Sequence, residues 1–104
     1  MSEPLNNPVM SEEFFRLFSR DDRKVFGYIL ALVLDLAAAE DIFQETCVIL
    51  WKEFPSFERD RSFLNWANGI AFNQVRKYRR KYQNKRLIFS DSLVTELAED
   101  VSGM

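Results

Sequence analysis

The sequence contains no histidine and only one cysteine, Cys47. Without histidine the chain cannot build a His-based zinc site, a Ser-His-Asp triad or a Cys-His nucleophile pair. A single cysteine excludes an internal disulfide framework and indicates a reducing compartment. A glycine-rich phosphate loop is missing as well. We therefore expect no catalytic residues, no metal, no cofactor and no enzyme activity.

Long apolar runs are also missing. The longest, residues 28–34, is far too short to cross a bilayer. Residues 1–10 are polar, contain Pro4 and Pro8, and lack the basic and apolar regions of a secretory signal. These absences predict a cytoplasmic protein without a membrane partner.

Glycine and proline number three each, and no alternation of apolar and polar residues indicates a strand. We therefore predict an all-α fold, a compact bundle of about four helices. Six apolar side chains at helical spacing are expected in the core: Phe18, Ile29, Ile42, Leu50, Trp66 and Ile70.

Polar residues that can cap helices mark the expected boundaries. Ser11 is predicted to cap a short first helix, and Ser19 with Asp22 resembles the capping box of a second. A third helix is expected from about Asp35 to about residue 54, where Pro55 ends it.

A polar loop over residues 56–61 follows, and Ser62 is predicted to cap a fourth helix over residues 63–82. We expect a flexible N-terminus over residues 1–10, one helical domain over residues 11–86, and an acidic linker with one marginal helix over residues 87–104.

Charge is unevenly distributed along the chain. Residues 1–58 carry 5 Lys and Arg against 11 Asp and Glu, a net of −6. Residues 59–86 carry 9 bases against one acid, a net of +8, and residues 87–104 carry four acids and no base, a net of −4. An acidic half joined to a basic segment indicates two different partner surfaces.

An acidic and amide-bearing stripe is expected on the third helix. Its members recur at i, i+3, i+4, i+7 and i+11, which places them on one face. They are Asp41, Gln44, Glu45, Val48 and Lys52. Such a stripe suits a basic helix of a partner protein, and a solvated face without a partner is the alternative.

The fourth helix ends in a basic cluster, residues 76–81, with Tyr78 and Tyr82 interleaved. The helix dipole favours cations at this end, so a solvated basic face is one interpretation. Phosphate contacts with bases stacked on tyrosine are the other. Asn65, Asn68 and Asn73 are poor helix formers whose amides suit base edges, and Phe72 is predicted to lie near them on the polar side.

The segment from Ala39 to Thr46 (AEDIFQET), followed by Leu50 and Trp51, resembles region 2.2 of extracytoplasmic-function sigma factors. Further matches are similar to regions 2.3 and 2.4 and end in the basic cluster; they are Phe63, Trp66, Ile70, Ala71 and Asn73. The resemblance covers about residues 14–86. It implies the helical region 2 domain of a transcription initiation factor.

The resemblance implies two partners and allows a third. The stripe on the third helix would dock on the coiled coil of the beta-prime subunit of core RNA polymerase. The loop and the fourth helix would bind the non-template strand of the minus-ten promoter element, with the loop capturing a flipped-out base. An anti-sigma factor is a further partner that such proteins can have. The implied DNA-binding residues are Ser56, Phe57, Glu58, Arg59, Asp60, Arg61, Asn65, Phe72, Asn73, Arg76, Lys77, Arg79 and Arg80.

Three positions differ from the patterns of related sigma factors. Housekeeping members carry two tryptophans where this chain has Gly69 and Ile70, and many extracytoplasmic-function members carry Arg at 69 and Asp where Lys77 stands. Gly69 costs about 1 kcal/mol in a helix interior and is expected to mark a close helix crossing. No helix-turn-helix follows Arg86, so we expect a fragment or an isolated domain. The main alternative function is a helical adaptor that binds protein and not DNA.

Overall fold

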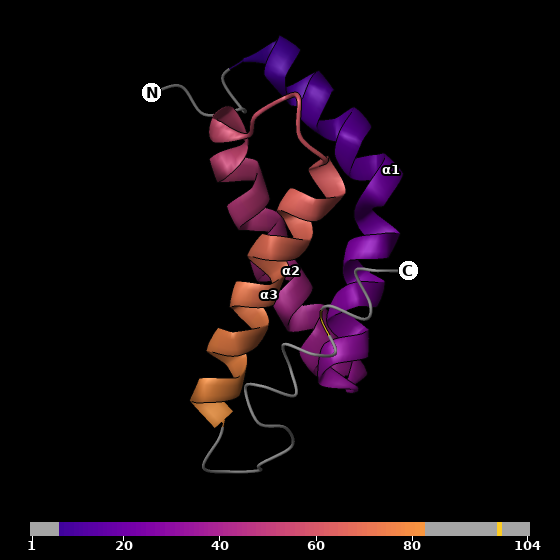
Figure 1. Cartoon of the computed structure of the whole chain (residues 1–104), viewed down its shortest axis with the longest axis vertical. Coiled ribbons are helices and arrows are strands. Elements are labelled where there is room, and N and C mark those ends of the chain that lie inside the picture. The colour runs from indigo at the N-terminus through magenta and orange to yellow at the C-terminus, as the bar shows by residue number, and fades with distance from the viewer. Residues whose placement is uncertain (1–6, 83–97, 99–104) are drawn as a thin grey trace.

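The structure is a computed structural model that describes residues 7–82 and Ala98. Three α-helices pack against one another: α1 (Pro8–Val33), α2 (Leu36–Glu53) and α3 (Phe63–Tyr82), with the short 3-10 helix η2 (Phe54–Ser56) after α2. In Figure 1, α1 descends, α2 returns upward and α3 descends again in front of α2. The described residues contain no strand, so the all-α prediction is confirmed.

The predicted count of about four helices is slightly too high, because α1 is one continuous helix. Asn7 caps it, with its Oδ1 accepting from the Met10 N–H at 3.1 Å, and Pro8 occupies the first turn. Ser11 and Ser19 therefore do not start helices. The helix also includes residues 8–10, which we had predicted to be flexible.

Burial of one long stripe keeps α1 continuous where Ser19 and Asp22 suggested the start of a second helix. The buried positions of α1 keep one helical phase from Phe14 through Val25 to Leu32, and Asp21 lies on the same stripe with 3% exposure. The Asp21 carboxylate accepts two hydrogen bonds from Arg20, at 3.2 and 2.8 Å. Packing of the whole stripe therefore outweighs the local capping signal.

The turn between α1 and α2 is short. Leu34 adopts a left-handed conformation (φ 55°, ψ 35°) and donates its N–H to the Leu30 carbonyl at 2.8 Å. That conformation costs a non-glycine residue about 1–2 kcal/mol. Asp35 then caps α2 through a 3.0 Å hydrogen bond from the Ala38 N–H, as predicted. Pro55 lies within η2, directly after the end of α2.

The loop after η2 rests on aromatic rings of α1, η2 and α3. Phe54 and Phe57 stack with centroids 5.9 Å apart, and Phe57 lies 4.8 Å from Trp66. Phe14 of α1 meets Phe54 edge-on at 5.1 Å. The loop ends where Ser62 caps α3, accepting from the Asn65 N–H at 3.1 Å. This boundary was correctly predicted.

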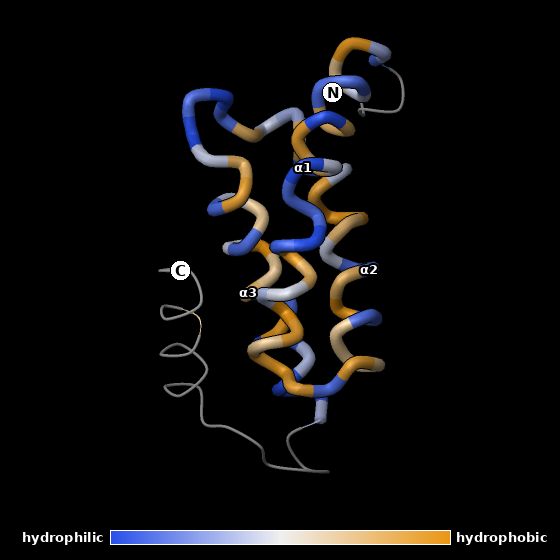
Figure 2. Tube along the Cα trace, turned by 90° about the vertical axis from the view of Figure 1, so that its right-hand side faces the viewer, coloured by the Kyte–Doolittle hydropathy of each residue, from blue (hydrophilic) through white to orange (hydrophobic). Residues whose placement is uncertain are grey.

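Apolar segments recur along all three helices in Figure 2 and meet in one core. Ile29, Ile42 and Leu50 are buried, as predicted. Phe18, Trp66 and Ile70 are partly buried and pack against that core. Ala98 also lies in the core and is helical. The remainder of the linker and marginal helix expected over residues 87–104 lies outside the described residues.

Gly69 does not mark a close helix crossing. It is exposed, and a Cβ atom built at this position would meet nothing within 4 Å. No helix of the described part is long and apolar enough to span a membrane.

Candidate functional site

The stripe of α2 faces solvent. Asp41, Gln44, Glu45, Val48 and Lys52 are all exposed, and Val48 retains 52% of its surface. The opposite face of α2 is anchored in the core by its buried residues, among them Ile42, Thr46 and Leu50. The Thr46 hydroxyl donates to the Ile42 carbonyl at 2.7 Å, which satisfies it within the helix. The stripe can therefore meet a partner without disturbing the packing.

A second exposed stripe runs along α3. Asn65, Gly69, Asn73 and Lys77 recur at every fourth residue, and all four are exposed. Asn68 lies on the other side and is 9% exposed, with no partner for its Oδ1 among the described residues. The three asparagines that looked alike in the sequence thus divide into two on the surface and one in the interior.

Phe72 is partly buried and packs against the core, so much of its ring is unavailable to a ligand. The basic residues at the end of α3 also differ in exposure. Lys77, Arg80 and Lys81 are exposed. Arg76 and Arg79 are half-buried, and each already has an interaction within the protein. Arg80 is therefore the arginine of this cluster that is most open to solvent.

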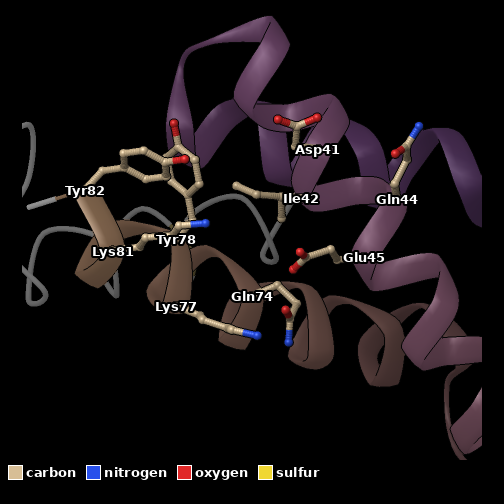
Figure 3. A pocket seen from close by; sticks show the side chains of 9 residues that line it. All are labelled: Asp41, Ile42, Gln44, Glu45, Gln74, Lys77, Tyr78, Lys81 and Tyr82. Atoms are coloured by element: carbon tan, nitrogen blue, oxygen red, sulfur yellow. The ribbon is translucent and has the colours of Figure 1, made fainter.

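A groove of about 330 Å³ lies between the two stripes. Figure 3 shows Asp41 and Glu45 on the α2 wall, with Lys77, Tyr78 and Lys81 on the α3 wall. Carboxylates and ammonium groups thus share one opening. The polymerase stripe expected on α2 and the basic end of α3 are neighbours, which their separation in the sequence did not reveal.

Tyr78 and Tyr82 close one end of this groove, with ring centroids 4.6 Å apart. Burial raises the pKa of the Tyr78 hydroxyl, and the nearby carboxylates of Asp35 and Asp41 together with Tyr82 add to the shift. The hydroxyl therefore stays protonated at neutral pH and is a hydrogen-bond donor.

Arg59 fixes the loop between η2 and α3. Its Nε donates to the Glu13 carboxylate of α1 at 2.8 Å, and its Nη1 donates to the carbonyls of Phe54 and Phe57. The guanidinium also lies over the Phe54 ring, 4.3 Å from its centroid. The loop is consequently tied both to α1 and to the aromatic core.

The loop residues divide by exposure. Ser56, Glu58, Asp60 and Arg61 face solvent, whereas Phe57 is 5% exposed and belongs to the core. Because its ring is covered by its aromatic neighbours, we remove Phe57 from the set of expected DNA contacts. Phe57 instead anchors the loop to the aromatic core.

A second cavity, of about 360 Å³, lies between this loop and α1. Residues 59, 61 and 62 line it on one side, and Arg16 and Arg20 of α1 line it on the other. The sequence analysis did not predict a functional role for these two α1 arginines. Their spacing of one helical turn can be read from the sequence, but their proximity to the loop depends on the tertiary fold.

Among the described residues, no group of three or more His, Cys, Asp or Glu side chains is placed to hold a metal ion. Cys47 is half-buried, and burial, with a smaller contribution from the Asp22 carboxylate, raises the pKa of its thiol to about 11. A thiol with this pKa is a poor nucleophile at neutral pH.

Comparison with known proteins gives one family and one curated relative. The family described as Sigma-70 region 2 matches residues 17–85. The "Probable RNA polymerase sigma factor RfaY" of Xanthomonas campestris pv. campestris is 29% identical over 76 residues. The match covers 73% of this chain and 19% of that relative, so the chain spans well under half of the curated protein. No solved structure gives a significant match.

Proposed function

The chain belongs to the sigma-70 region 2 family, and from this premise we propose that it binds core RNA polymerase and reads the minus-ten promoter element during transcription initiation. In this proposal the α2 stripe docks on the beta-prime coiled coil. The exposed stripe of α3 and the loop bind the non-template strand. An anti-sigma factor that covers either surface would inhibit the protein.

One observation carries the proposal: the two expected surfaces are both exposed, and they lie on adjacent helices of one small bundle. The stripe with Asp41 and Glu45 offers carboxylates for charge-assisted hydrogen bonds to a basic helix. The neighbouring helix offers Lys77 and Arg80 for phosphates and Asn73 for base edges. A strand on α3 and a protein on α2 can therefore be held together at the same domain.

The loop supports capture of a flipped-out base. Its backbone is held by Arg59 and by the aromatic core below it, and a cavity opens beside it. Unstacking a base costs a few kcal/mol, and a preformed site reduces the further cost of ordering the protein. The solvent-facing loop side chains are the candidates to contact such a base; they are Ser56, Glu58, Asp60 and Arg61.

The DNA part of the proposal is tested by fluorescence anisotropy on labelled single strands, with and without core polymerase, at several salt concentrations. Arg80→Ala should weaken binding to all sequences alike and flatten the log–log salt slope by about 0.7, the value for one phosphate contact on a single strand. Asn73→Ala should leave the slope unchanged and reduce discrimination among minus-ten variants by about 1–3 kcal/mol at one position.

The polymerase part is tested on the α2 stripe. Gln44→Ala, or Asp41→Ala combined with Glu45→Ala, should cost roughly 1–3 kcal/mol of core binding if these hydrogen bonds are desolvated on docking. Circular dichroism should stay the same, because the side chains are exposed. Glu53→Ala, an exposed acid of the same helix outside both the stripe and the segment that resembles region 2.2, is the matched control.

The adaptor hypothesis makes the opposite prediction for DNA. An adaptor would lose its protein partner in the α2 variants. It would show no strand preference with polymerase present, and neither Arg80→Ala nor Asn73→Ala would alter strand binding. That pair of results would replace the promoter-reading role with the adaptor role.

A further inference from the structure

The cavity between α1 and the loop is lined by four arginines. Arg16 and Arg20 of α1 lie on one side, and Arg59 and Arg61 of the loop lie on the other. Three of them have an acidic partner, since Arg20 pairs with Asp21, Arg59 with Glu13 and Arg61 with Glu58. Four arginines against these three acids leave a formal charge of +1 at this cavity of about 360 Å³, which favours an anion.

Two of the four arginines are already held in position. Arg20 forms a bidentate pair with the buried Asp21, and this hydrogen bond raises the pKa of its guanidinium. Arg59 is held by Glu13 and by two backbone carbonyls. The Nε and Nη2 donors of Arg20 are bound to Asp21 and those of Arg59 to Glu13, so neither fork is open to a phosphate. Arg20 keeps its Nη1 as a donor beside Arg16, and a guanidinium that is fixed before binding loses less entropy when it binds.

Arg16 differs from the other three arginines, because it is exposed and has no ion-pair partner among the described residues. It lies one helical turn before Arg20, and like charges at this spacing repel one another. Ser62 and Phe63, which also line the cavity, form the N-terminal end of the 20-residue α3. The helix dipole adds positive potential at this end.

The apolar residues of the lining offer little surface to a base. Leu17, Phe57 and Phe63 line the cavity, but the two phenylalanines are only 5% and 2% exposed. The cavity therefore suits a phosphate rather than a nucleotide base. The cavity is also continuous with the proposed DNA surface, because Ser62 both lines it and caps the helix that carries Asn65.

We propose that Arg16 and Arg20 bind a backbone phosphate of the single strand next to the base held at the loop, so that the DNA path continues from α3 across the loop onto α1. This inference rests on the proposed function. It adds a helix and two residues that neither the family match nor the sequence pattern assigned to DNA.

The test uses the full 104-residue chain and a fluorescein-labelled oligothymidine of about 12 nucleotides, which is within the length that single-strand sites cover. A phosphate contact carries no sequence information, so a homopolymer reports it. Arg16→Ala should weaken binding roughly tenfold and flatten the salt slope by about 0.7. Arg23→Ala is the matched control, because Arg23 is an exposed arginine on α1 outside the cavity.

Arg20→Ala is a weaker test on its own, since it removes the ion-pair partner of the buried Asp21 and can destabilise the fold. Thermal unfolding of each variant separates this effect from lost binding. If Arg16→Ala and Arg23→Ala reduce affinity and slope equally, the site on α1 is rejected. If Arg80→Ala still flattens the slope in that case, the proposed function stands.

A free-anion arm completes the experiment. Sodium phosphate is compared with sodium chloride at equal ionic strength. If phosphate stabilises the protein against heat and Arg16→Ala abolishes this effect while strand affinity stays unchanged, the cavity binds free phosphate and the DNA assignment is wrong. If the wild-type chain binds no strand even with core polymerase, the proposed function itself is wrong, and the α1 site is rejected with it.

Discussion

Arg59 and Glu13 connect the loop to the first helix across 46 residues of sequence, with Nε and Oε2 2.8 Å apart. Their side chains are 38% and 28% exposed, so the pair lies at the surface and not in the core. A pair of this kind contributes little to global stability, typically about 0–1 kcal/mol. Its larger effect is local, because it holds the loop beside α1.

Glu13→Ala should therefore loosen the loop without unfolding the protein. The free energy of unfolding should fall by less than about 1 kcal/mol. Hydrogen exchange should accelerate at the amides of Phe57 and Arg61, which donate to Phe54 and Glu58 within this segment. Glu12→Ala, an exposed acid on the same helix, is the control. Equal exchange rates in both variants would show that the ion pair does not hold the loop.

Gly69→Ala should stabilise the domain by about 1 kcal/mol. Alanine is the better helix former by this amount, and its Cβ would meet nothing within 4 Å. Gly27→Ala in α1 has the same open surroundings and should give a similar gain. Urea unfolding followed by circular dichroism measures both. A loss of stability in Gly69→Ala alone would contradict the open surroundings of Gly69 and indicate that another helix packs closely against it.

Glu45→Gln should have opposite effects on the two partners. Glu45 and Lys77 line the same groove, so the carboxylate lowers the positive potential that a strand meets on α3. Without polymerase, removal of this charge should strengthen strand binding by about 1.5-fold to fivefold, the range of an exposed pair, and the gain should disappear in high salt.

Core polymerase binding of the same variant should become weaker, since Glu45 belongs to the stripe proposed to dock. Glu53→Gln removes the same charge outside the groove and should change neither assay appreciably. If both variants alter strand binding equally, the effect comes from net charge and not from the groove.

The pH dependence of stability should contain a contribution from Cys47. Its pKa is raised to about 11 in the folded chain from 9.0, mainly by burial. The unfolded chain therefore loses the thiol proton first, so stability falls as pH rises from about 9 to about 11. Cys47→Ala should lack this part of the decline. Iodoacetamide should alkylate the folded chain slowly at pH 8 and the urea-unfolded chain faster; equal rates would contradict the shift.

Local features of the sequence determined much of the fold. The caps Asp35 and Ser62 act within three residues of themselves, so their positions fixed the starts of α2 and α3. The helical spacing of Ile42 and Leu50 identified the buried face of α2 for the same reason. It also indicated that Asp41 and Glu45 are exposed, which the structure confirms.

Tertiary packing decided the features that the sequence predicted wrongly or left open. Ser19 and Asp22 resemble a capping box, and only the burial of the whole stripe makes α1 one helix. Phe57 reads as a loop residue, and only contacts with Phe54 and Trp66 place it in the core. Arg16 meets the loop because α1 and α3 pack together across more than 40 residues of sequence. Caps and helical periodicity act over one or two turns, whereas a cavity forms between elements that are distant in sequence, so its lining is determined by the way the helices pack.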